Sequence, residues 1–296
     1  MVGPTASGKT ALGIYLAQKL KGEVISADSR QVYKGLNIGT GKVTKKEMAG
    51  IPHHLLDVAT PKKVFSASDF KTLGERAINK ILRNQNIPII VGGTGLYVDV
   101  LVGKMVLPDV PPNMKLRAKL EKLPTETLFA MLKKKDPERA ENIEPSHKRR
   151  LIRALEIAEA VGTSPTKRSA MKNEELYDVL WIGLNPGEET LQKNISKRLR
   201  TRIQDGMLAE GKRLHAAGLS YKRMEELGLE YRSMSQYLQK KSTKEQLIEE
   251  LDRAIARYAK RQMRWFKRNK EIHWVKNKSE ALSIVRVYGL MPTRRS

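Results

Sequence analysis

The 296-residue chain contains no cysteine, and this absence excludes several kinds of site at once. A disulfide framework, a thiolate-bound metal and an iron–sulfur cluster all need cysteine. Aromatic residues make up only 5% of the chain, and the longest apolar stretch, residues 87–103, is interrupted by Asp99 and four glycines. Such a stretch is too short and too polar to cross a membrane. We therefore expect a soluble cytoplasmic protein with no membrane partner.

Acidic residues are also scarce. The chain has 56 lysines and arginines against 32 aspartates and glutamates, which gives a formal net charge of +24. An excess of this size is typical of proteins that bind a polyanion, and nucleic acid is the favoured partner here. Residues 1–110 hold 15 basic and 8 acidic side chains, whereas the rest of the chain holds 41 and 24. The first third therefore suits a small ligand, and the remainder suits the polyanion.

Short apolar runs alternate with helical patterns through the first third of the chain. We expect buried strands at "EVISADS", "HHLLDV" and "IPIIVGG", with helices over residues 10–20 and 68–83 between them. This alternation predicts an α/β fold in which helices flank a parallel sheet. Ligands bind at the carboxyl ends of such strands, so Asp28 and Thr94 become candidate site residues.

Three prolines between Leu107 and Asn113 mark a change in this pattern. The following segment is basic and helical up to about Lys172, and a strand-like run returns at residues 179–187. We predict a catalytic core formed by residues 1–110 and 176–296, interrupted by a helical insertion domain at 111–175. Two long helices, over residues 188–215 and 243–270, are expected in the C-terminal part.

The chain opens on a phosphate-binding motif, "GPTASGKT", in which Gly3, Gly8, Lys9 and Thr10 fit G-x-x-x-x-G-K-T. Backbone N–H groups of such a loop cradle phosphates, Lys9 would bridge phosphate oxygens, and the Thr10 hydroxyl would coordinate Mg²⁺. Only Met1 and Val2 precede Gly3, so we expect the strand that leads into the loop to be short. The fold class is thus a sheet like that of the P-loop NTPases.

An ordinary ATPase of this class also carries a metal-binding carboxylate at the end of a late strand. The corresponding run here, "IPIIVGGTG", ends in glycine and threonine, so Asp28 or Asp57 would have to substitute. Asp28 itself admits two interpretations. It could cap the turn in "ADSR", or it could act as a general base beside the phosphate loop.

Seven motifs then occur in a specific order: "GPTASGKT", "ISADSRQVY", "IPHHLLDV", "FSASDF", "VGGTGLY", "RRLIRALE" and "RYAKRQMRWF". As a set they resemble the tRNA dimethylallyltransferases, from the first residues to about Lys270. The resemblance implies a Mg²⁺-dependent enzyme that uses dimethylallyl diphosphate, and we expect it to act as a monomer. It would prenylate the exocyclic amine of the adenine on the 3′ side of the anticodon, in the anticodon stem-loop of tRNA.

The resemblance also implies site residues. The diphosphate would bind to Gly3, Pro4, Thr5, Ala6, Ser7, Gly8, Lys9 and Thr10. Asp28 would be the catalytic base, with Lys9 and Thr10 acting on the leaving group. The tRNA would contact Asp28, Ser29, Arg30, Gln31, Thr94, Arg117, Arg149, Arg150, Leu151, Ile152 and Arg153. One departure is "LGLEYRSM", which stands where related chains commonly have Gly-Tyr, and we assign no site residue to it.

In the last long helix, five arginines recur every three or four residues and share one face: Arg253, Arg257, Arg261, Arg264 and Arg268. This face is either an ordinary solvated surface or a phosphate-contacting one, and we select Arg257 and Arg261 as tRNA contacts. Leu247, Leu251, Ile255 and Tyr258 line another face. The basic runs at residues 197–202 and 133–135 are expected to be ordinary surface.

Aromatic and histidine residues receive structural roles. His53 and His54 are adjacent in a predicted strand, so they point to opposite faces and cannot easily share a metal ion. Trp265 and Phe266 are expected to anchor the last helix, with base stacking as the alternative for Trp265. Two other functions stay open at this point: a kinase or prenyltransferase that acts on a free adenine nucleotide, and an RNA-binding ATPase.

Overall fold

The computed structural model describes residues 1–161 and 177–290. The chain divides into two compact units, which we call the core unit (residues 1–102 and 177–296) and the insertion unit (residues 103–176). The part of the predicted helical segment between residues 162 and 172 lies outside the described residues. Among the described residues, no helix combines the length and the apolar character that a membrane span needs.

The core unit contains a parallel sheet. Its first part has the strand order β2-β1-β3, from His53–His54, Gly22–Ala27 and Ile87–Gly92, and its second part pairs β4 (Ile182–Leu184) with β5 (His273–Val275). Val2 forms single parallel bridges to Gly92 and to Gly183, so it joins the two parts. The residue that precedes the phosphate loop thus takes part in the sheet.

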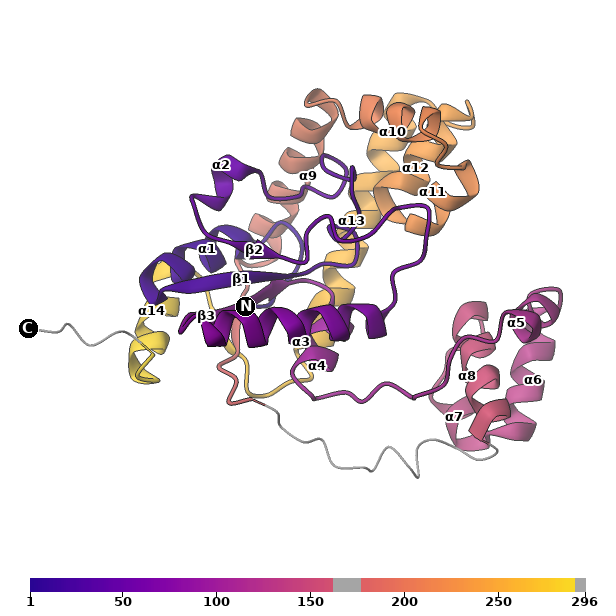
Figure 1. The fold of residues 1–296 in the computed structure, drawn as a ribbon. Coiled ribbons are helices and arrows are strands. Elements are labelled where there is room, and N and C mark those ends of the chain that lie inside the picture. Colours follow the sequence, from indigo (N-terminus) through magenta and orange to yellow (C-terminus); the bar gives the residue numbers. More distant parts are fainter. Residues whose placement is uncertain (162–176, 291–296) are drawn as a thin grey trace, which may run out of the picture. The chain divides into compact units, whose positions relative to one another are not determined.

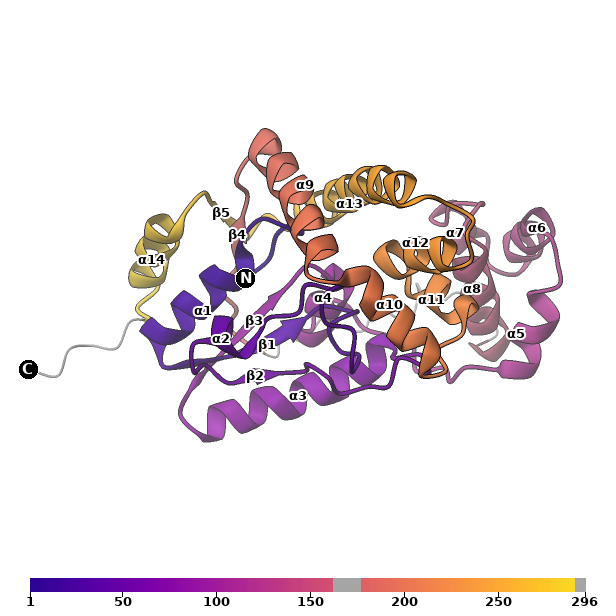
Figure 2. The same ribbon diagram turned by 90° about the horizontal axis from the view of Figure 1, so that it is seen from above.

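Helices cover both faces of this sheet, with α1 (Lys9–Leu20) and α3 (Ala67–Arg83) on opposite sides of β1 (Figures 1 and 2). Strand alternation explains the arrangement, because successive side chains point to opposite faces. Val24 packs with Leu12 and Leu16 of α1, whereas Ile25 packs on the other face with Phe70 of α3. The remaining helices of this region are α2 (Lys45–Met48), α4 (Gly95–Leu101) and α14 (Lys278–Val287).

The strand predicted at "HHLLDV" is wrong beyond its first two residues. Only His53 and His54 pair with β1, since Leu55 and Asp57 have positive φ angles of 64° and 55° and turn the chain away. Left-handed backbone of this kind cannot continue a strand.

The C-terminal helices of the core unit are α9 (Glu188–Gln204), α10 (Met207–Ala216), α11 (Tyr221–Leu227), α12 (Leu229–Leu238) and α13 (Lys244–Phe266). The prediction of one helix over residues 188–215 is wrong, because α9 ends at Gln204 and Gly206, with a φ of 97°, is the N-cap of the next helix. The predicted last helix begins where its sequence indicates: the Thr243 and Gln246 side chains form a capping box.

The insertion unit is helical in its described part, with α5 (Met114–Leu120), α6 (Thr125–Lys135), α7 (Pro137–Glu141) and α8 (Lys148–Val161). Figure 1 draws these helices in magenta shades. They enclose a hydrophobic core of their own, built around Leu120, Leu128, Leu132, Leu151 and Leu155. The described part of this unit thus has a hydrophobic core distinct from those of the core unit.

Candidate active site

The phosphate loop has the geometry that its sequence predicts. It begins at Gly3, where an added Cβ would lie 2.6 Å from the Leu184 carbonyl oxygen, and it ends at Gly8, which starts α1 with a φ of 92°. The first N–H groups of a helix have no intrahelical partner, and the helix dipole adds positive potential there. The Ser7 hydroxyl is buried and lacks a hydrogen-bond partner among the described residues, so it can donate to an oxyanion.

A cavity opens beside this loop at the carboxyl ends of β1 and β3. All of its lining residues belong to the core unit: Thr5, Lys9, Thr10, Val24, Ser26, Asp28, Gln31, Thr40, Val43, His53, Val91, Gly92, Arg198, Tyr258 and Gln262. Several elements that lie far apart in the sequence therefore meet at the phosphate loop. This is the position where parallel α/β sheets bind their ligands.

Lys9 lies in the phosphate loop with its ammonium close to other charges. Its Nζ donates to the Pro4 carbonyl oxygen at 3.1 Å. Burial lowers the pKa of Lys9 to about 8, the Arg198 guanidinium contributes to the decrease, and the Asp28 carboxylate opposes it. A partly desolvated lysine of this kind gains most from an anionic ligand, because the ligand restores the charge that burial disfavours.

Asp28 follows β1 and lines the cavity. Its Oδ1 accepts hydrogen bonds from the backbone N–H of Arg30 at 2.8 Å and of Gln31 at 3.3 Å. The turn-capping role is therefore present in the structure. It does not compete with a role in the cavity, because the cap holds the carboxylate beside the phosphate loop.

The neighbouring candidates form a hydrogen-bonded group around this turn. Thr94 Oγ1 accepts from the backbone N–H of Ser29 at 3.1 Å, and the Arg30 guanidinium donates to the Ser29 carbonyl oxygen at 3.2 Å. Gln31 Nε2 donates to the Gly41 carbonyl oxygen at 3.3 Å. The structure thus brings Ser29, Arg30, Gln31 and Thr94 together at one edge of the sheet.

The expectation that residues 197–202 are ordinary surface is wrong. Arg198 lines the cavity, and Arg202 is only 8% exposed. Their guanidinium groups donate to the carbonyl oxygens of Gly41 and Gly39, each at 3.2 Å. A sequence signal for Arg202 existed: it continues the buried stripe of Leu191, Ile195 and Leu199 at helical spacing.

Two further cavity residues come from α13. Gln262 Oε1 accepts from the backbone N–H of Thr5 at 2.8 Å, and its Nε2 donates to the Gly93 carbonyl oxygen at 2.8 Å. Tyr258, which the periodicity groups with core leucines, lines the cavity and hydrogen-bonds with Thr94. Burial raises the pKa of the Tyr258 hydroxyl, so it stays neutral. Arg257 and Arg261 are exposed on α13, and the Arg261 guanidinium lies 5.7 Å from the centre of the Tyr258 ring.

The insertion-unit candidates fall into three groups. Arg149 and Arg150 are exposed at the start of α8. Leu151 and Ile152 are 0% and 4% exposed, so their side chains are core residues rather than RNA-facing ones. The other two, Arg117 and Arg153, pair with Glu156 inside the unit, and Arg117 Nη2 lies 2.7 Å from Glu156 Oε2.

The remaining candidates from the sequence form hydrogen bonds or ion pairs with other residues of the core unit. His54 pairs with Glu23 at 2.6 Å, whereas His53 Nδ1 bonds the Ile51 carbonyl oxygen at 2.8 Å, so the two histidines do not share a ligand. Asp57 is paired with Lys42 at 2.6 Å. Trp265 Nε1 donates to Asp99 Oδ2 at 2.9 Å, in keeping with an anchoring role.

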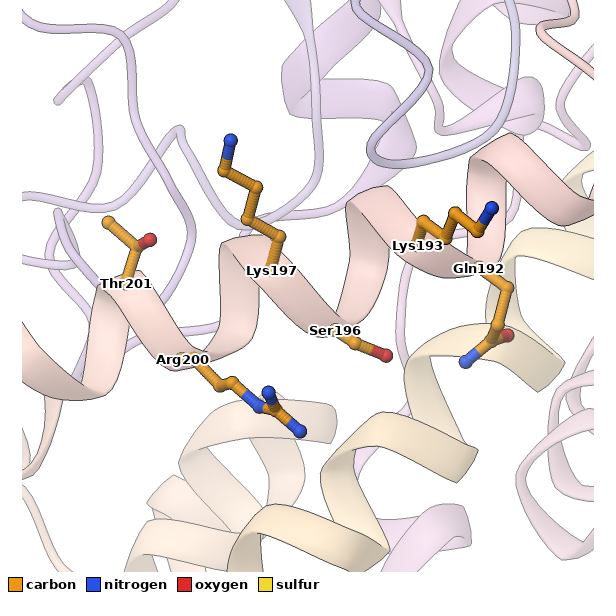
Figure 3. A pocket seen from close by; sticks show the side chains of 6 residues that line it. All are labelled: Gln192, Lys193, Ser196, Lys197, Arg200 and Thr201. Atoms are coloured by element: carbon orange, nitrogen blue, oxygen red, sulfur yellow. The ribbon is translucent and has the colours of Figure 1, made fainter.

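A second hollow lies along α9. Figure 3 shows its lining residues, which all belong to that one helix: Gln192, Lys193, Ser196, Lys197, Arg200 and Thr201. Gln192 and Ser196 already donate to Asp252, at 3.0 and 2.6 Å. The hollow contains neither a phosphate loop nor a carboxylate, so the cavity at the strand ends is the better candidate for a reaction site.

A family model described as IPP transferase matches residues 31–269 of the chain. The chain is 41% identical over 276 residues to a tRNA dimethylallyltransferase of Anoxybacillus flavithermus, covering 93% of this chain and 88% of that protein. It is 42% identical over 290 residues to the tRNA dimethylallyltransferase 2 of Treponema denticola, covering 93% and 94%.

Solved structures give the same picture. The full-length tRNA isopentenylpyrophosphate transferase from Bacillus halodurans superposes with a TM-score of 0.72 at 35% identity, over 98% of this chain and 94% of that one. A eukaryotic dimethylallyltransferase, described as acting on tRNA, superposes with a TM-score of 0.84 at 28% identity, over 99% and 80%.

Proposed function

Because the chain belongs to the IPP transferase family, we propose that it transfers the dimethylallyl group of dimethylallyl diphosphate to tRNA. The acceptor is the exocyclic amine of the adenine on the 3′ side of the anticodon. The observation that carries the proposal is the single cavity in which the phosphate loop, Asp28 and Arg198 converge. These groups meet the two needs of a transfer reaction, because they provide a binding site for the leaving diphosphate and a base for the attacking amine.

The diphosphate binds to the loop from Gly3 to Thr10, where backbone N–H groups, Lys9 and Ser7 face it. Arg198 adds a second cation from α9. Charge develops on the diphosphate as its C–O bond breaks, and fixed cations in a partly dehydrated cavity stabilise that charge. Val24, Val43 and Val91 give the cavity an apolar wall suited to an isoprenoid.

The amine nitrogen forms the new C–N bond and loses a proton to Asp28, while the diphosphate leaves with the electrons of the C–O bond. The lone pair of the adenine amine is delocalised into the ring, so the nitrogen is a poor nucleophile. Removal of its proton by a base therefore favours formation of the C–N bond. The turn cap on Oδ1 fixes the orientation of the carboxylate. The base must also leave the anticodon-loop stack, which costs a few kcal/mol (~2–4).

We propose Mg²⁺ as the metal, held by the Thr10 hydroxyl and by oxygens of the donor. Among the described residues, no group of three His, Cys, Asp or Glu side chains could hold a metal alone. That fits Mg²⁺, which usually binds through one or two protein oxygens together with phosphates and water. When bound, the ion neutralises charge on the leaving diphosphate.

The tRNA partner is supported by exposed arginines on both units. Arg257 and Arg261 lie on α13 of the core unit, and Arg149 and Arg150 lie on α8 of the insertion unit. Arginine forks suit phosphate oxygens, and most of the affinity for a nucleic acid comes from such contacts. We propose that the enzyme acts as a monomer, and a tRNA substrate supports a cytoplasmic location.

The decisive test incubates the protein with labelled dimethylallyl diphosphate, Mg²⁺ and unmodified tRNA. We expect label on the tRNA, lost when the acceptor adenine is replaced by guanine. Label on free AMP alone would instead indicate a nucleotide prenyltransferase. Hydrolysis of ATP without label transfer would indicate an RNA-binding ATPase, and either result would contradict the proposal.

A further inference from the structure

Two arginine side chains lie close together beside Gly41, near the phosphate loop. An added Cβ on Gly41 would lie 2.2 Å from Arg198 Nη2 and 1.9 Å from Arg202 Nη2, so these two nitrogens are within about 4.1 Å of each other. Gly41 has a φ of 56°, and only glycine leaves room for both groups. Arg198 faces the cavity with Lys9, whereas Arg202 lies behind it and is buried.

A buried carboxylate touches this group of cations from α12. Glu230 Oε1 lies 3.2 Å from Arg202 Nη1, and the two side chains are 13% and 10% exposed. Glu230 also acts on Arg198 at longer range, where it opposes the effect of Arg202. A charge pair this poorly exposed is weakly screened by salt, so its field reaches the cavity.

The position of this carboxylate coincides with the departure noted in the sequence. Glu230 precedes Tyr231 in "LGLEYRSM", the segment to which the sequence assigned no site residue. A buried anion needs a reason, because its desolvation is costly.

We propose that Glu230 is an internal counter-anion that lowers the affinity of the cavity for diphosphate and thereby promotes release of the diphosphate product. The inference depends on the proposed function for the identity of the ligand. Arg202 raises the positive potential behind Arg198, and Glu230 cancels part of it. The product diphosphate leaves more readily from a site whose cations are partly neutralised from within.

The test measures binding of inorganic diphosphate with Mg²⁺ by calorimetry. Glu230→Gln keeps the shape of the side chain and removes its charge, so we expect the dissociation constant to fall by about tenfold. For two unit charges in a medium with an effective dielectric constant of about 20, a tenfold effect corresponds to a separation on the order of 10 Å. Product inhibition by diphosphate in the transfer assay should strengthen by a similar factor.

Arg202→Met should change binding in the opposite direction, and Arg202→Met/Glu230→Gln should return it toward the wild-type value. Glu189→Gln is the matched control, because it removes the same charge at a fully solvated position on α9, where Glu189 is 83% exposed and pairs with Lys193. It should leave binding unchanged. A role of Glu230 in folding alone would lower thermal stability and would not tighten binding.

Unchanged or weaker diphosphate binding by a folded Glu230→Gln variant would overturn the inference. If that variant does not fold, the comparison of the double variant with Arg202→Met replaces it, and equal affinities of these two would overturn the inference. Absence of diphosphate binding by the wild-type protein would contradict the proposed function itself, and the inference with it.

Discussion

Asp28 combines two roles that the sequence left as alternatives, and the structure offers a way to separate them. Asp28→Asn keeps an Oδ1 acceptor for the N–H groups of Arg30 and Gln31, so the turn should survive. It removes the base, and we expect turnover to fall by a factor of about 100 or more. Single-turnover transfer of the label gives this rate. Asp28→Ala removes base and cap together and is the matched comparison.

Binding of tRNA by Asp28→Asn should change by less than about twofold, because the carboxylate is one contact among many phosphate contacts. Near-normal turnover in Asp28→Asn, with the melting temperature unchanged, would reduce Asp28 to its capping role.

The lowered pKa of Lys9 predicts that binding of the diphosphate donor is coupled to the uptake of protons. Its pKa of about 8 in the free protein lies well below the usual 10.5, so Lys9 is charged at pH 7 and becomes neutral as the pH rises through 8. A bound diphosphate favours the charged form. Binding near pH 8.5 should therefore take up a fraction of a proton, whereas binding near pH 6.5 should take up almost none at this lysine.

Calorimetric titrations with diphosphate in two buffers of different ionisation enthalpy measure this uptake. Lys9→Arg is the control, since arginine stays charged throughout the range. Equal proton uptake by the wild type and by Lys9→Arg at pH 8.5 would show that another group titrates.

Among the secondary-structure elements, α13 has two faces with different roles. Gln262 on one face joins the phosphate loop to the turn after β3, and Arg257 and Arg261 on the other face are exposed. Reversal of both arginines to glutamate should weaken tRNA binding by at least tenfold and reduce the slope of log affinity against log salt by about two.

The pair Lys80→Glu and Arg83→Glu, at the exposed end of α3, introduces the same charge change and should affect binding less. Diphosphate binding should be retained in both double variants. An unchanged salt slope in the α13 variant would place the RNA contacts on other elements.

The insertion unit allows a prediction for its own stability. Burial alone would raise the pKa of Glu156, but hydrogen bonds from Arg117, Arg153 and the Asn113 backbone lower it to about 2. The pKa in the folded state is thus below that in the unfolded state. The stabilisation is fully present above about pH 4.5 and is lost as the pH falls toward 2.

Arg117→Met should cost the unit about 1–2 kcal/mol at pH 7, since Arg117 is partly solvated and Arg153 still pairs with Glu156. Denaturant unfolding at pH 7 and at pH 3 measures this effect, which should be smaller at pH 3. Arg149→Met is the exposed control. A loss of tRNA binding by Arg117→Met with unchanged stability would instead support the direct RNA contact that the sequence resemblance implies.

Across the whole molecule, sequence patterns predicted the features that depend on residues close together in the chain. The phosphate loop, the strands β1 and β3 and the start of α13 follow from residue type and spacing, and each is present. The break at Gly206 was missed because an isolated glycine in a helical pattern is often tolerated. The turn after His54 was missed because Leu55 and Asp57 adopt left-handed angles that residues of their type seldom take.

The cavity residues from α9 and α13 could not be predicted for a different reason. Arg198 and Gln262 reach the phosphate loop only through the tertiary packing of helices that lie late in the chain. Their spacing marks which helix face is buried, but not what that face meets. The pairing of Glu156 with two arginines is equally non-local, and it explains why a basic pattern alone overstated the number of free cations.

The hydrogen bond between Thr5 and Gln262 joins residues 257 positions apart in the chain. A ribosome adding about 5–20 residues per second needs on the order of 13–50 seconds to separate their synthesis. During that interval the phosphate loop emerges without the residue that fastens it to the turn after β3. The nascent chain should therefore acquire its affinity for diphosphate late, once α13 has left the exit tunnel, and not when its first hundred residues have folded.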